Sequence, residues 1–161
     1  MTCGLMRSPP WQSQEFLAAH WRHPALGVIN VYSVYMDQGG MAEEAGKQTL
    51  ANLFQHAAQS GLQWLAMGDW NTPPEQMLQA DWIQKKGIRV RSTEEATCHP
   101  STGEDSFLDY ALMSARLEEA FLQPQVLKGM GDIKTHEAVS MTMLAPADWP
   151  DVEFIVAPRR V

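Results

Sequence analysis

The chain has 161 residues, of which 45% are hydrophobic and 19% are charged. This composition excludes a disordered or low-complexity chain and predicts one domain with a substantial core. The formal net charge of −7 excludes nucleic-acid binding by a broadly positive surface. A local site that holds a metal ion can still act on phosphates, because the cation supplies the missing positive charge.

The start of the chain and its cysteines indicate where the protein resides. Cys3 and Cys98 have no spacing typical of metal or redox sites. No run of about 18 apolar residues is present, and Met1–Trp11 lacks the apolar segment of a signal peptide. We therefore expect a reduced, intracellular protein, cytoplasmic or nuclear, without a membrane span. Residues 1–14 do not resemble a natural domain start, and we expect them to be a fragment edge.

The first half of the chain predicts two strands, one helix and a third strand. In chain order these elements are residues 15–21, 28–35, 41–60 and 62–67. The second strand is dense in β-branched and aromatic residues, which favours a buried position. The helix has apolar residues at i, i+3, i+4 and i+7, and Gly61 ends it. The third strand is almost entirely apolar and stops at Gly68.

The second half predicts shorter elements. A helix begins after Pro73 and extends to about Lys86, since proline is favoured in a first helical turn. The elements expected after it are strands at 88–91, 96–99 and 106–114, helical turns at 115–123, a strand at 136–144 and a short edge strand at 152–156. The alternation of helices and strands predicts the α/β or α+β class.

Two polar residues, Asp69 and Asn71, directly follow the third strand. At this spacing their side chains can point the same way. A carboxylate can accept a proton or hold a metal-bound water, and an amide can donate to an anionic oxygen. Gly, Asp and Asn are also the usual residues of a β–α turn. From spacing alone the turn is the favoured interpretation.

Three further residues are candidates for chemistry. Asp109 lies within an apolar strand, where a buried carboxylate needs a partner, unless this face of the strand is exposed. His136 opens a later strand, and a lone histidine there is more often structural. If the two strands lie side by side, the carboxylate would orient the imidazole. Tyr32 by itself is expected to be a core residue. The sequence contains no Gly-rich phosphate loop, serine nucleophile elbow or zinc motif.

Four fragments, taken in order, resemble the endonuclease/exonuclease/phosphatase superfamily, the DNase I-like metal-dependent phosphodiesterases. The fragments are residues 29–32, 65–71, 106–110 and 134–139. They are similar to the family's strand with an active-site Tyr, its Gly-Asp-Phe-Asn motif, its Ser-x-Ile-Asp-Tyr strand and its final Ser-Asp-His-x-Pro-Val motif. The resemblance implies half of a DNase I-like four-layer α/β sandwich, with one mixed sheet and helices on one face. Residues 15–145 would be the C-terminal half of that domain, and residues 146–161 a tail.

The resemblance also implies an activity and roles for five residues. The reaction would be Mg²⁺-dependent hydrolysis of phosphodiesters or phosphomonoesters, with DNA, RNA, phosphoinositides or nucleotides as substrates. Asp69 would orient or deprotonate the attacking water, and Asp109 would fix the ring of His136. Asn71, His136 and Tyr32 would donate to the phosphate. We expect these residues to converge at one rim of a single sheet, while the metal ligands remain unassigned.

Two departures from the family pattern affect this prediction. Thr135 stands where the family has an acidic residue, and a hydroxyl replaces a carboxylate poorly on Mg²⁺. The first half of the family domain, with its metal-binding Glu, is expected to be missing. We therefore expect a truncated hydrolase domain that is weak or inactive alone and has a bare sheet face favouring self-association. The alternatives are a non-catalytic remnant of a retroelement-type endonuclease and an α/β interaction module.

Overall fold

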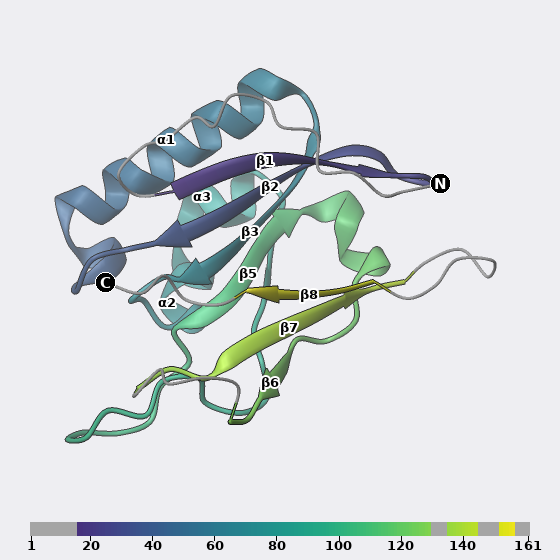
Figure 1. Cartoon of the computed structure of the whole chain (residues 1–161). Coiled ribbons are helices and arrows are strands. Elements are labelled where there is room, and N and C mark those ends of the chain that lie inside the picture. Colours follow the sequence, from purple (N-terminus) through teal and green to yellow (C-terminus); the bar gives the residue numbers. More distant parts are fainter. Residues whose placement is uncertain (1–15, 130–134, 145–151, 157–161) are drawn as a thin grey trace.

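A computed structural model describes residues 16–129, 135–144 and 152–156. These residues form a helical layer, a five-stranded sheet and a three-stranded sheet (Figure 1). The larger sheet has the order β1 (Phe16–His23), β2 (Gly27–Tyr35), β3 (Gln63–Asp69), β5 (Asp109–Ser114) and β4 (Ile88–Arg91). It is mixed, because β2 and β3 are parallel and the other neighbours are antiparallel. Residues 1–14, expected to be a fragment edge, lie outside the described residues.

The helices cover one face of the five-stranded sheet. They are α1 (Glu44–Ser60), α2 (Pro74–Gln79) and α3 (Asp81–Lys85), with a short 3₁₀ turn, η1 (Gly40–Ala42), before α1. The apolar stripe of α1 packs on the sheet, and Gly61 ends the helix with a φ of 64°. The single helix expected up to Lys86 is broken at Ala80, whose backbone is extended. This break allows Met77 and Ile83, one from each short helix, to be buried in the same core.

The second sheet corrects the sequence-based expectation of one sheet. It has the order β6 (Gln125–Leu127), β7 (Ala138–Met143) and β8 (Val152–Val156), and a 3₁₀ segment, η2 (Ala115–Ala120), precedes it. The strand that follows His136 therefore belongs to a separate layer. The strand expected at 96–99 is represented only by isolated bridges from Cys98 to Ser106 and to His136.

Both faces of the five-stranded sheet are covered. The core on the helical side contains Tyr32, Leu53, Trp64 and Met77, among others. The core on the other side joins sheet residues to residues of η2, β7 and the chain that follows η2: Ile29, Leu65, Met67 and Met113 pack with Leu117, Phe121, Met141 and Met143. The expected bare sheet face is therefore wrong for the described part of the chain. No described helix is long and apolar enough to cross a lipid bilayer.

Candidate active site

Three side chains form a row across the five-stranded sheet. The strand register pairs Tyr35 of β2 with Asp69 of β3, and Asp69 with Asp109 of β5. Directly paired residues project from the same face of a sheet, and here that face is the one covered by the second sheet. Asp69 and Asp109 are each 7% exposed, whereas Tyr35 is exposed. Two carboxylates are thus brought together at the rim between the layers.

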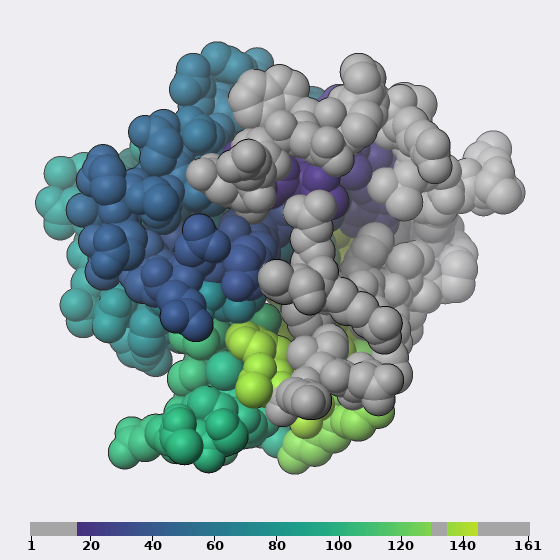
Figure 2. Space-filling model, turned by 60° about the vertical axis from the view of Figure 1, so that its left-hand side comes forward, coloured from purple at the N-terminus to yellow at the C-terminus, as the bar shows by residue number. Residues whose placement is uncertain are grey.

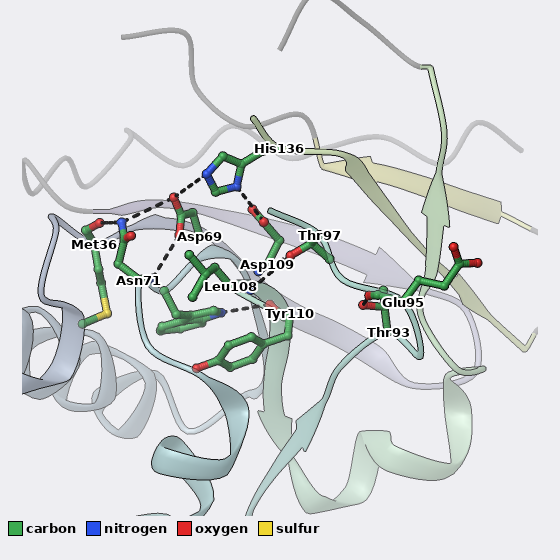
Figure 3. A network of polar contacts seen from close by, with 11 residues as sticks. Met36, Asp69, Asn71, Thr93, Glu95, Thr97, Leu108, Asp109, Tyr110 and His136 are labelled. Carbon is green, nitrogen blue, oxygen red and sulfur yellow. Dashed lines mark hydrogen bonds and ion pairs between the residues drawn. The ribbon is translucent and has the colours of Figure 1, made fainter. Parts of the chain in front are cut away.

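His136 reaches this row from the other layer. Its Nδ1–H donates to Oδ2 of Asp109 at 2.8 Å, and its Nε2 lies 3.8 Å from Oδ2 of Asp69 (Figure 3). The hydrogen bond expected between Asp109 and His136 is therefore present, although 27 residues separate them. Figure 2 shows segment 135–144, in yellow-green, at the surface beside the green loop that precedes β5. The His136 side chain is 17% exposed, so solvent reaches part of the imidazole.

The pKa values of the site follow from burial and from this hydrogen bond. The hydrogen bond to Asp109 raises the pKa of His136 above its ordinary value, against the effect of burial. Burial raises the pKa of Asp69 to about 6, and the nearby Asp109 carboxylate adds to the rise. The Asn71 backbone N–H and His136 oppose part of that rise. Asp69 can therefore exchange a proton near neutral pH beside an imidazole that favours its charged form.

Asn71 holds Asp69 in place. Its backbone N–H donates to Oδ1 of Asp69 at 3.0 Å, and its amide Nδ2 donates to the Met36 carbonyl oxygen at 2.6 Å. The same Nδ2 lies 3.4 Å from Oδ2 of Asp69. Its φ of 43° is in the left-handed region, which asparagine tolerates better than most residues. Asn71 thus lies in a turn, and in this geometry its amide Nδ2 faces two acceptors of the protein, the Met36 carbonyl oxygen and the Asp69 carboxylate.

The residues around Asp69 are dictated by close packing. A Cβ atom at Gly68 would lie 1.8 Å from the Val34 carbonyl oxygen, so no larger residue fits between β2 and β3. Trp70 is fully buried, and its Nε1–H donates to the Tyr110 carbonyl oxygen at 2.9 Å. Its ring also stacks on that of Tyr110. These contacts anchor both neighbours of Asp69 and leave its carboxylate at the rim.

Tyr32 is not brought into this group. Its side chain is fully buried on the helical face of β2, and its hydroxyl is hydrogen-bonded to Nδ1 of His56 at 2.8 Å. Tyr35 occupies the position expected for Tyr32, because it is paired with Asp69. Alternation along a strand could have distinguished the two tyrosines, since residues three apart lie on opposite faces.

The donor set of the site fits a divalent cation. Ligand atoms of Asp69, Asp109 and His136 all lie within 4.8 Å of one another. Mg²⁺ is typically held by one or two carboxylates, with waters and phosphate oxygens completing its shell. Because Mg²⁺ prefers oxygen ligands, the two carboxylates, rather than Nε2 of His136, are the groups that would hold the ion. Thr135, the residue before His136, is exposed and offers only a neutral hydroxyl.

No protein-family model and no curated protein matches the chain by sequence. Solved structures match it. The 3′-5′ exonuclease from Neisseria meningitidis has a TM-score of 0.57 and 17% identity, over 88% of this chain and 70% of that one. Cytolethal distending toxin from Actinobacillus actinomycetemcomitans has a TM-score of 0.56 and 18% identity, over 81% and 53%. An endonuclease/exonuclease/phosphatase family protein from Leptotrichia buccalis has a TM-score of 0.56 and 13% identity, over 81% and 54%.

The chain has part of the DNase I-like fold. It spans about half the length of the toxin and of the Leptotrichia protein. The prediction of a partial DNase I-like α/β fold is therefore confirmed. At these identities the likeness concerns the fold alone, and the chemistry depends on the residues of this chain.

Proposed function

We propose that this DNase I-like chain is a metal-dependent phosphoester hydrolase domain. The observation that carries the proposal is the imidazole of His136, held by Asp109 on one side and facing Asp69 on the other. An oriented imidazole next to a carboxylate with a pKa of about 6 is a suitable pair for proton transfer near neutral pH. The exonuclease of similar fold supports the assignment to phosphoester chemistry.

Each residue has a role in this proposal. Asp69 accepts a proton from the attacking water. His136, in its charged form, donates to a phosphoryl oxygen as negative charge develops there. Asp109 orients the ring and stabilises the imidazolium. A divalent cation held by Asp69 and Asp109 would neutralise the phosphate oxygens. Asn71 acts indirectly, because it keeps the Asp69 carboxylate in position.

The expected rate of the 161-residue chain is low. Mg²⁺ binds charged oxygens much better than neutral hydroxyls, and Thr135 adds no charge beside the two carboxylates. The same observation favours a second candidate, a non-catalytic remnant of such a domain. The two candidates differ in whether an added carboxylate at position 135 produces activity.

A single substitution tests the proposal. We expect Thr135→Asp to increase Mg²⁺-dependent hydrolysis of a model phosphodiester and to lower the Mg²⁺ concentration required, because a third carboxylate joins the cation site. EDTA should remove the activity, and Asp69→Asn in the same background is the inactive reference. If neither wild type nor Thr135→Asp exceeds that reference, the hydrolase proposal is contradicted and the remnant is favoured.

The two tyrosines provide a matched pair of variants. Tyr35→Phe is expected to lower hydrolysis by about 10- to 100-fold, the loss typical of one hydrogen bond to a charged group. Tyr32→Phe should leave the rate near wild type and reduce only stability, because Tyr32 faces α1. Steady-state rates and urea denaturation of both variants check this. The reverse order of effects would restore Tyr32 to the site.

A further inference from the structure

Asp109 is the first residue of β5, whereas His136 lies two residues before β7 of the other sheet. Backbone hydrogen bonds of a third segment join these two parts of the chain. Segment Thr97–His99 lies between the segment that leads into β5 and the segment that carries His136. On one side Cys98 exchanges backbone hydrogen bonds with Ser106, just before β5. On the other side the Glu137 N–H donates to the Thr97 carbonyl oxygen at 2.8 Å, and the His99 N–H to the Thr135 carbonyl oxygen at 2.7 Å.

Thr97 also binds the Asp109 backbone directly. Its side chain is fully buried, and its Oγ1 accepts the N–H groups of Leu108 at 3.1 Å and of Asp109 at 3.0 Å (Figure 3). Thr97 therefore binds the Asp109 N–H through its hydroxyl and the Glu137 N–H, next to His136, through its carbonyl oxygen.

We propose that Thr97 is a positioning residue that sets the geometry of the Asp109–His136 pair. The two N–H groups that its hydroxyl accepts are those of Leu108 and Asp109. Without the hydroxyl, the Leu108 N–H would lose this acceptor and the Asp109 N–H would lose it in a buried position, which is costly. The backbone would then have to move to find other partners, and the Asp109 carboxylate would move with it. The consequence for catalysis rests on the proposed function, whereas the consequence for the pair itself does not.

Thr93 offers a matched control in the same loop. It is also buried, and its hydroxyl donates to the Glu95 carbonyl oxygen at 2.6 Å, within its own turn. Among the described hydrogen bonds, none joins the Thr93 side chain to Leu108 or Asp109. Valine has nearly the same shape as threonine, so either substitution removes one hydroxyl with little change in packing. Only the substitution at Thr97 should alter the geometry of the Asp109–His136 pair.

The first readout is spectroscopic and needs no substrate. The proton on Nδ1 of His136, held by a carboxylate, should give a slowly exchanging downfield signal in nuclear magnetic resonance, assigned by its loss in His136→Gln. We expect this signal in wild type, Thr97→Ser and Thr93→Val, and its loss or broadening in folded Thr97→Val. An unchanged signal in folded Thr97→Val would overturn the proposal.

Two further measurements separate the possible failures. If Thr97→Val does not fold, Thr97→Ala is measured in its place. Amide hydrogen exchange in wild type should also show that the Asp109 N–H is protected. A freely exchanging Asp109 N–H would overturn the proposal as well. In hydrolysis assays we expect kcat to fall about 10- to 100-fold in the Thr97 variant with KM little changed, and Thr97→Ser to retain it. If wild type is inactive while the signal still depends on Thr97, the proposed function fails and the positioning role stands.

Discussion

His136→Ala is expected to lower the rate of phosphoester hydrolysis by about 100-fold or more, because it removes both a proton donor and a preorganised positive charge. The chain offers a matched control in His99, whose Nδ1 lies 2.9 Å from Oδ2 of Asp105 in an exposed pair. His99→Ala removes the same kind of hydrogen-bonded imidazole outside the site, so its rate should remain near wild type. Equal losses in the two variants would show that the effect is not specific to His136.

The pH profile gives a second test of the same residue. The rate should fall as the imidazolium of His136 loses its proton above the ordinary histidine pKa. It should rise at lower pH as Asp69 loses its proton, and this rising limb should move to lower pH as Mg²⁺ is added, because the cation favours the charged carboxylate. In His136→Ala the falling limb should disappear while the rising limb stays. A wild-type profile without a falling limb would contradict the donor role of His136.

Asp69→Asn is expected to stabilise the protein at neutral and alkaline pH. The pKa of Asp69 rises from an ordinary value of 3.8 to about 6 on folding, so the folded state binds this proton more tightly than the unfolded state. That stabilisation is complete below pH 3.8 and is lost as the pH rises through 6. Above this range the buried carboxylate destabilises the fold by up to about 3 kcal/mol. Asparagine removes the charge and keeps an oxygen that can accept the Asn71 N–H.

Urea denaturation at about pH 4 and about pH 8, in EDTA, measures this effect. The gain in free energy of unfolding should be present at the higher pH and small at the lower one. Asp81→Asn is the control, because Asp81 is exposed and forms only a surface ion pair with Lys85 at 3.4 Å. A variant with no gain at either pH would show that Asp69 is not destabilised by burial. The same variant should lose activity, so stability and function would change in opposite directions.

Sequence reasoning located the polar residues that matter most. Asp69 and Asp109 interrupt apolar strands, and a carboxylate in such a place needs a partner, which led to His136. The helix at 44–60 was also predictable, because a long apolar stripe and Gly61 define it without reference to the rest of the fold.

The remaining features depend on contacts between distant segments. β6 has only three residues and is a strand because β7 pairs with it. The choice between Tyr32 and Tyr35 depends on which face of β2 meets the helices. The role of Thr97 depends on two backbone N–H groups more than ten positions away. Local composition contains none of this information.

The position of His136, on the segment that leads into β7 rather than on the five-stranded sheet, has a consequence for the thermal behaviour of the site. The five-stranded sheet with its helices and the three-stranded sheet are separate hydrogen-bonded ladders. They are joined by apolar packing and, beside the site, by the few backbone hydrogen bonds of Thr97–His99. Partial opening of the smaller ladder would carry His136 away from Asp109 while most of the secondary structure persisted. Inactivation should therefore occur at a lower temperature than the loss of the helical circular dichroism signal. The difference between the two temperatures would report how strongly the two ladders are held together.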